Sequence, residues 1–164
     1  YPESILVLHR RGESLLHPNF TEMLNYVKGK FKEVQLATNA TVMDHEKARI
    51  MIECLNFISF SLDTPDRYEK IKGIDYQRVL ENIIYFLRNN NKVRTQVSMV
   101  KTDDVGEKEV GEFKKLWMGK VDRIRIYQQH SAKGKFGPQL NRPSGVGIPW
   151  LIKICWWFGL AGSS

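Results

Sequence analysis

The sequence predicts an α/β fold with parallel strands, and two observations support this prediction. Short apolar runs rich in β-branched and aromatic residues alternate with amphipathic stretches along the chain. Successive runs lie at intervals close to the size of a β-α-β unit, roughly 30 residues, whose right-handed crossover makes its two strands parallel. The expected strands are Ile5–His9, Glu33–Thr38, Phe57–Leu62, Val93–Lys101 and Arg123–Gln128.

Four amphipathic helices are expected between these strands. The first follows Asn19, an N-cap residue type, with Glu22 three residues later as in a capping box. The second follows the N-cap candidate Asp44, and the third ends in the run Asn89–Asn91, which tolerates left-handed turns. The fourth is expected at about Lys108–Met118. Each helix has an apolar face that should be buried. In chain order these faces are Phe20, Met23, Leu24, Val27 and Phe31 in the first helix; Ala48, Met51, Ile52 and Leu55 in the second; Val79, Leu80, Ile83, Ile84 and Leu87 in the third; and Val110, Phe113, Leu116 and Trp117 in the fourth.

Two architectures fit this alternation, an open doubly wound sheet and a barrel, and periodicity does not distinguish them. In both, ligands bind at the carboxyl ends of the strands and in the loops that follow. Functional residues are therefore expected directly after each strand.

Composition limits the class of protein. The 164 residues suffice for one compact domain, and the net charge of +7 favours acidic partners in general. Lys and Arg are spread along the sequence, so no nucleic-acid partner is predicted. Two cysteines, Cys54 and Cys155, exclude a disulfide framework and a self-contained zinc site, and they favour the cytoplasm. Cys54 is expected to be a buried thiol near the end of the second helix.

The chain divides at about residue 132. Residues 1–132 are expected to form the α/β domain. Residues 133–164 are expected to form an irregular tail rich in Gly, Pro and Trp, which is a remnant of a C-terminal domain or a linker to one. Lys153 interrupts the apolar part of the tail, so no membrane partner is predicted, and an interfacial anchor is the weaker alternative. Because the sequence lacks an initial Met and opens directly before a strand-like run, we expect it to be a piece of a longer protein.

The loops after the first two strands carry polar candidates. Gly12 allows a close backbone approach to a ligand, and the Glu13 carboxylate can pair with an ammonium group. Thr38 and Asn39 can supply hydrogen bonds after the second strand. Each feature also has a purely structural interpretation, a turn glycine beside a solvated glutamate and an asparagine in a left-handed turn.

Polar residues also alternate along the later strands. Ser59, Ser61 and Asp63 share one face of the third strand, and such a row needs either a polar ligand or internal hydrogen bonds. Arg125 on the fifth strand binds a carboxylate if it faces inward, and an exposed salt bridge is the alternative. Which face of the last two strands looks inward is open: Arg94, Gln96, Ser98, Arg123 and Arg125 form the polar rows.

Several other chemistries are excluded by spacing. The histidines show no H-E-x-x-H pattern, and the sequence contains no P-loop, no G-x-G-x-x-G and no G-x-S-x-G element.

Taken in order, the strand-end loops resemble the radical S-adenosylmethionine superfamily. In that family a Gly-Gly-Glu or Gly-Arg-Gly-Glu-Pro element runs into Leu-Leu-His-Pro, as Arg11–Pro18 does here. Thr-Asn-Gly follows, which Thr38–Ala40 resembles, and then Ser-x-Ser-Leu-Asp, matched by Ser59–Asp63. A final Tyr-Glu-x-Ile-Arg-Gly stretch is matched by Tyr68–Gly73.

The resemblance implies a partial (β/α)6 TIM-like barrel of which this chain holds the second to sixth strands, the first being missing. Such enzymes cleave S-adenosylmethionine reductively at a 4Fe-4S cluster and abstract a hydrogen atom from a substrate. Many relatives carry a C-terminal domain called SPASM and modify peptides or proteins. The cofactor-binding residues implied are Gly12, Glu13, Thr38, Asn39, Ser59, Ser61, Asp63 and Lys72.

One departure is large. The family holds its cluster with a C-x-x-x-C-x-x-C loop after the first strand, and thiolates are the ligands that iron requires there. This sequence has no such loop, so no metal ligands are predicted, and the chain alone is expected to be inactive.

Three functional hypotheses follow. The first is a radical S-adenosylmethionine core with a small-molecule cofactor, an unknown and possibly peptide substrate, and self-association through the open barrel edge. The second is a non-catalytic basic α/β domain that binds an acidic partner. The third is an unrelated α/β enzyme with a different nucleotide ligand, which an open sheet with reversed strand order would favour.

Overall fold

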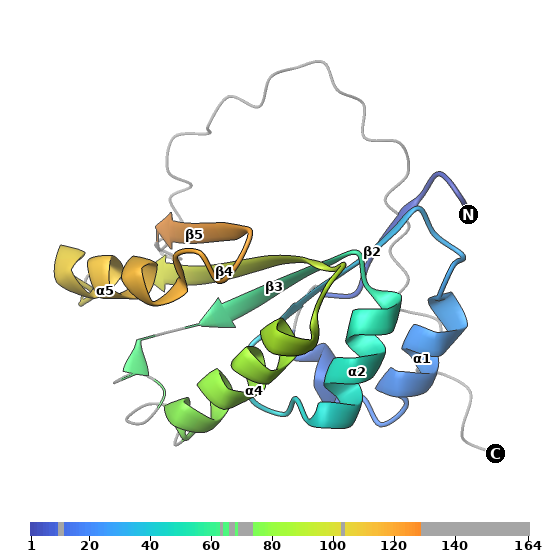
Figure 1. The fold of residues 1–164 in the computed structure, drawn as a ribbon, viewed down its shortest axis with the longest axis horizontal. Helices are drawn as coiled ribbons and strands as arrows, with labels where there is room; N and C mark the ends of the chain where they lie inside the picture. The colour runs from blue at the N-terminus through green and yellow to red at the C-terminus, as the bar shows by residue number, and fades with distance from the viewer. Residues whose placement is uncertain (10–11, 63, 66–67, 69–73, 103, 129–164) are drawn as a thin grey trace, which may run out of the picture.

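The computed structural model describes residues 1–9, 12–62, 64–65, 68, 74–102 and 104–128. Strands alternate with helices as expected, and Figure 1 shows α1, α2 and α4 together against one face of the sheet. The described elements are β1 (Ile5–Val7), the short 3-10 helix η1 (Ser14–Leu16), α1 (Phe20–Val27), β2 (Glu33–Thr38), α2 (His45–Cys54), β3 (Phe57–Leu62), α4 (Tyr76–Asn89), β4 (Arg94–Lys101), α5 (Glu107–Trp117) and β5 (Arg123–Gln128).

The sheet is parallel, and its strands lie in the order β1-β2-β3-β4-β5. Each crossover therefore moves the chain in the same direction. A doubly wound sheet reverses its order at a switch point, and this sheet has none. The arrangement confirms the prediction of an α/β fold and agrees with part of a TIM-like barrel.

The two faces of the sheet differ in character. The strand register pairs residues in rows across the sheet. One row runs from Ala37 through Ser59 and Gln96 to Arg123, and the next runs from Ser61 through Ser98 to Arg125. The polar rows of the last two strands therefore share a face with the serines of β3. Apolar side chains occupy the opposite face and pack beneath the helices, including Leu36, Ile58, Phe60, Val97 and Met99.

Helix starts depend on backbone conformation at the cap. Asp44 and Asp75 are extended, and their carboxylates accept bonds from the backbone N–H groups of Lys47 and Gln77, respectively. Asn19 makes no side-chain cap bond, so the expected capping box is wrong. Its φ of −98° and ψ of 24° depart from the extended conformation that directs a cap side chain toward the helix.

Aromatic residues form the centre of the core between sheet and helices. Phe60 of β3 meets Phe86 of α4 edge to face, with ring centroids 5.4 Å apart. Trp117 of α5 is 1% exposed. Within the described residues, no helix is long and apolar enough to cross a membrane.

Two strands, β3 and β5, are each preceded by a polar residue whose side chain hydrogen-bonds to the neighbouring strand. We call each of these contacts a clasp. Asn56 precedes β3, and its Oδ1 accepts a bond from Val34 N of β2 at 2.8 Å. Asp122 precedes β5, and its Oδ2 accepts from Thr95 N at 2.7 Å and Thr95 Oγ1 at 2.9 Å in β4. Both clasps lie at the amino ends of the strands and fix the register there.

The Asp122 clasp makes stability depend on pH. Hydrogen bonds from the Thr95 backbone and hydroxyl hold the pKa of the Asp122 carboxyl below its usual range. A lowered pKa adds stability that is present above the unfolded-state value of about 4 and is lost as pH falls through the folded-state value. We expect Asp122→Ala to lower the free energy of unfolding at neutral pH, because it removes both hydrogen bonds to Thr95. The loss should be only about 1 kcal/mol, since the carboxylate is exposed to solvent.

Urea unfolding followed by circular dichroism measures this difference at neutral and acidic pH. The difference between the variant and the parent chain should shrink below about pH 4. Glu112→Ala, which removes an exposed carboxylate from α5, is the control and should change little. Equal unfolding free energies of Asp122→Ala and the parent chain at neutral pH would contradict the clasp.

Candidate functional site

The carboxylate of Glu13 joins the loop after β1 to the loop after β2. Oε1 accepts bonds from Thr38 Oγ1 at 2.8 Å and Leu15 N at 3.2 Å, and Oε2 accepts from Asn39 N at 2.9 Å. An ionised carboxylate offers about four acceptor sites, and donors among the described residues occupy three of those on Glu13. We call Glu13, Thr38, Asn39 and Ala40 the Glu13 cluster.

The loop after β1 reaches this cluster through a left-handed residue. Gly12 has a φ of 82°, and a side chain there would point into open space, with no atom within 4 Å of its Cβ. Its conformation favours glycine for backbone reasons rather than for crowding. Ser14 Oγ donates to Leu8 O at 2.5 Å and folds the loop back onto the end of β1.

The loop after β2 is tightly hydrogen-bonded. Asn39 Oδ1 accepts from Thr41 N at 3.0 Å and Thr41 Oγ1 at 2.7 Å, and Thr38 Oγ1 accepts from Ala40 N at 3.0 Å. Ala40 is fully buried with a φ of 58°, a left-handed conformation that costs about 1–2 kcal/mol for a residue with a Cβ. The surrounding bonds therefore hold a strained backbone at this point.

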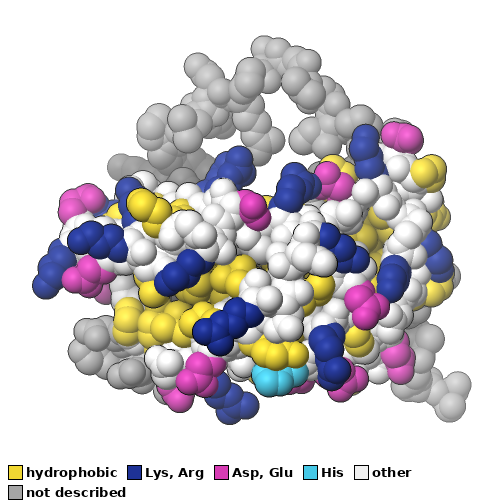
Figure 2. Space-filling model, viewed as in Figure 1, with side chains coloured by type: hydrophobic (Ala, Val, Ile, Leu, Met, Phe, Trp, Pro, Cys, Tyr) yellow, Lys and Arg dark blue, Asp and Glu magenta, His cyan; other side chains and the backbone are white. Residues whose placement is uncertain are grey.

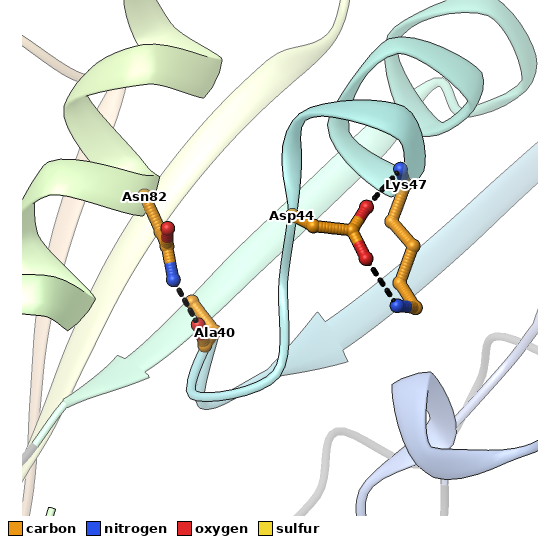
Figure 3. Close-up of polar contacts among 4 residues, drawn as sticks. All are labelled: Ala40, Asp44, Lys47 and Asn82. Carbon is orange, nitrogen blue, oxygen red and sulfur yellow. Dashed lines mark hydrogen bonds and ion pairs between the residues drawn. The ribbon is translucent and has the colours of Figure 1, made fainter.

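A second element reaches this loop from outside. Asn82 of α4 donates its side-chain Nδ2 to Ala40 O at 3.1 Å, and Asp44 caps α2 at the other end of the loop (Figure 3). Asp44 also contacts Lys47 Nζ at 2.5 Å. The loop is thus fastened both at its start and at its end.

The two described serines of the polar row on β3 differ in their surroundings: Ser59 is buried and hydrogen-bonded, whereas Ser61 is exposed. Gln96 Nε2 donates to Ser59 Oγ at 2.9 Å, and both side chains are buried. Ser98 Oγ donates to Phe60 O at 3.4 Å. Ser61, one residue before the end of β3, is exposed, and its carbonyl accepts a bond from Tyr68 Oη at 3.3 Å.

The structure brings together only some of the predicted residues. Gly12, Glu13, Thr38 and Asn39 meet at one point, with Thr38 2% exposed and acting through Glu13. Ser59 and Ser61 lie on the neighbouring strand. Asp63 and Lys72 are outside the described residues.

Arg125 shares the polar face of the sheet. It is exposed, and its guanidinium carbon lies 6.0 Å from the ring centroid of Tyr127. This separation is at the outer limit for a contact between a cation and an aromatic ring. Binding of a carboxylate by Arg125 stays a prediction.

Sequence reasoning missed Asn82 and the role of Gln96. Gln96 belongs to an alternating polar row that is visible in the sequence, and pairing with Ser59 follows once the register is known. Asn82 is one polar residue on an amphipathic helix, and nothing in its neighbours points to a partner 42 positions away.

A hollow of about 420 Å³ lies at the opposite, amino edge of the sheet. Its cations are already engaged: Lys92 Nζ donates to Glu53 O, Arg94 pairs with Glu33, and Lys120 Nζ donates to Leu116 O. The amino edge of a barrel typically serves stability rather than binding. We therefore assign the hollow to the structural contacts around Asp122 and Thr95 rather than to the candidate site. Its lining consists of Leu87, Asn90, Asn91, Lys92, Val93, Arg94, Thr95, Gly119, Lys120, Val121 and Asp122.

Comparison with protein families identifies the domain. The family model described as the radical SAM superfamily, where SAM is S-adenosylmethionine, matches residues 11–116. The chain belongs to the radical SAM superfamily. The matched segment contains the whole Glu13 cluster and β2, β3 and β4.

Two proteins of known structure, SuiB and TYW1, have a similar fold. SuiB from Streptococcus suis aligns with a TM-score of 0.63 and 17% identity, covering 79% of this chain and 30% of SuiB. SuiB bound to S-adenosylmethionine gives the same values, and TYW1 with a lysine-pyruvate adduct bound gives a TM-score of 0.57 and 16% identity over 80% of this chain and 43% of that one. This chain thus spans less than half of each of these proteins. No curated protein matches the sequence.

The thiolate set of this radical SAM chain does not fit the family's cluster. The described residues contain no group of three His, Cys, Asp or Glu side chains placed to hold a metal ion. Cys54 lies at the end of α2, next to the amino end of β3, and is 6% exposed. Cys155 is outside the described residues. The low exposure of Cys54 confirms the expected buried thiol.

Burial should make Cys54 unreactive. Desolvation raises the pKa of its thiol, which lowers the fraction of reactive thiolate at neutral pH. In a Cys155→Ser chain, we expect iodoacetamide to alkylate Cys54 at least about tenfold more slowly than it alkylates glutathione. Mass spectrometry over time gives the rate, and denaturant should restore it. Fast alkylation of the folded chain would contradict the placement of Cys54.

Proposed function

We propose that this chain is the part of a radical SAM core that binds the methionine end of S-adenosylmethionine at the carboxyl edge of its sheet. The observation that supports this most directly is the Glu13 carboxylate, which joins two strand-end loops and has one acceptor site that no described residue fills. Ligands of parallel α/β folds bind at this edge.

The proposed roles follow from chemistry. The Gly12 backbone and the free acceptor site of Glu13 would bind the ammonium group. The exposed Ser61 hydroxyl would contact the ribose or the methionine carboxylate, with Asn39 and Ser59 nearby and Thr38 holding Glu13. Asp63 and Lys72 complete the proposed set, and Lys72 would supply a positive charge for the carboxylate.

In the longer protein that we infer, a 4Fe-4S cluster of the kind the family holds would donate one electron to S-adenosylmethionine. The cofactor would then break into methionine and a 5′-deoxyadenosyl radical, which would abstract a hydrogen atom from the substrate. We propose a peptide or protein substrate for that protein. The support is a structural neighbour, SuiB bound to its precursor peptide SuiA, with a TM-score of 0.62 and 17% identity. The contribution of this chain is to bind and orient the cofactor.

The alternative of a basic surface for an acidic partner has less support. Figure 2 shows Lys and Arg side chains interspersed with Asp and Glu over the visible face. At the amino edge, Lys28 pairs with Glu53 and Lys32 with Glu3. Pairing of this kind reduces the field available to steer a polyanion.

Binding of S-adenosylmethionine by the chain itself tests the proposal. Equilibrium dialysis with radiolabelled S-adenosylmethionine should show saturable binding. Glu13→Gln should raise the dissociation constant about tenfold, because the amide removes a charged acceptor from the proposed ammonium. Circular dichroism should show that both proteins are folded.

Glu112→Gln is the matched control, since it makes the same change at an exposed position of α5 and should leave affinity unchanged. Absence of saturable binding to the parent chain would overturn the proposal. An unchanged dissociation constant in Glu13→Gln would remove Glu13 from the site.

Self-association is proposed through β1, an edge strand of the described sheet. Ile5 is 40% exposed there, and Tyr1 stacks on Phe31 beside it. Sedimentation velocity should show a dimer that increases with concentration and is weakened by Ile5→Lys. Val42→Lys, a change away from this edge, is the control. A monomer at all concentrations would contradict this proposal.

A further inference from the structure

Asn82 reaches from α4 across to the loop after β2, where it contacts the most strained residue of the Glu13 cluster. Its Nδ2 donates to Ala40 O at 3.1 Å (Figure 3), and Ala40 has a φ of 58°. We infer that Asn82 is a positioning residue for the Glu13 cluster: it holds Ala40 left-handed so that the backbone N–H of Asn39 stays on Glu13. The inference rests on the proposed function.

The geometry connects Asn82 to Glu13 in two short steps. Asn82 binds the carbonyl of Ala40, and the preceding residue, Asn39, donates its N–H to Glu13 Oε2 at 2.9 Å. Thr38 Oγ1 both donates to Glu13 Oε1 at 2.8 Å and accepts from Ala40 N at 3.0 Å. A change of φ at Ala40 would therefore move donors to both carboxylate oxygens.

Asn82 is the side-chain contact by which α4 reaches the Ala40 backbone. The other bond to Ala40 O comes from Met43 N inside the same loop, at 3.3 Å. Bonds within the loop move with it, whereas Asn82 is anchored on a helix of 14 residues that packs against the core. Asn82 therefore sets the loop relative to the rest of the fold.

One turn further along α4, Tyr85 holds the far end of the same loop. Its ring stacks on His45, the first residue of α2, with centroids 3.7 Å apart and planes 11° apart. Residues three apart share a face of a helix. One face of α4 thus holds both ends of the segment from Ala40 to His45, which explains how a strained residue persists there.

Two variants test the inference. Asn82→Leu keeps the approximate size of the side chain and removes the donor. We expect a roughly tenfold increase in the dissociation constant for S-adenosylmethionine and a roughly tenfold faster amide hydrogen exchange at Asn39 and Ala40, measured by nuclear magnetic resonance. Asn89→Leu is the matched control on the same helix. Among the described residues, its Nδ2 donates to Tyr85 O within α4, so both readouts should stay at the parent values.

Ala40→Gly in the Asn82→Leu background distinguishes positioning from packing. Glycine adopts the left-handed conformation without a steric cost, so the pinning bond is no longer needed. We expect the dissociation constant and the exchange rates to return to within about threefold of the parent values. Failure of Ala40→Gly to restore them would overturn the inference in favour of a packing role for Asn82.

The two readouts separate this inference from the proposed function. If the parent chain binds no S-adenosylmethionine, the proposed function fails, while amide exchange still tests whether Asn82 holds the loop. Unchanged exchange in Asn82→Leu overturns the inference whatever the affinity. Faster exchange with unchanged affinity also overturns it, because the position of the loop would then have no effect on cofactor binding by the Glu13 cluster.

Discussion

The bonds between Glu13 and the loop after β2 are the interaction on which the candidate site depends. β1 and β2 are neighbouring parallel strands, so their carboxyl ends meet at one edge, but nothing in strand pairing extends into the loops. The carboxylate does extend there, since it accepts from Thr38, Asn39 and Leu15 at once. Its three bonds therefore link the two loops beyond the ends of the paired strands.

The two edges of the sheet perform different tasks. At the amino edge, Asn56 and Asp122 bond to the neighbouring strand, and several cations there pair with carboxylates or carbonyl oxygens. At the carboxyl edge, the Glu13 carboxylate has an acceptor site that no described residue fills, and the Ser61 side chain is exposed to solvent. The stabilising contacts of the amino edge and the proposed binding groups of the carboxyl edge are thus separated by the length of a strand.

Most of the fold could be predicted from the sequence because its signals are local. Strand alternation and helical periodicity are visible over a few residues, and the structure keeps the strands β2, β3 and β5 at their predicted bounds. The family resemblance also located the Glu13 cluster, which the superfamily match contains. The cap at Asn19 failed because a sequence shows the residue type and not its φ and ψ.

Contacts between distant residues could not be predicted. The bonds of Asn82 to Ala40 and of Asp122 to Thr95 join positions 42 and 27 apart, and each requires the register or helix placement to be known first. The direction of Arg123 and Arg125 was open for the same reason. Once β5 is placed on β4, the register decides the face on which both arginines lie.

The strand order β1-β2-β3-β4-β5 has a consequence for how the domain is made. Each strand pairs with the one synthesised just before it, so no strand must wait for a distant partner to leave the ribosome. Every new strand and its helix can be added to the growing edge of a sheet that already exists. Domains dominated by pairings between neighbouring units also keep contact order lower than folds in which the first and last strands pair, which favours rapid folding.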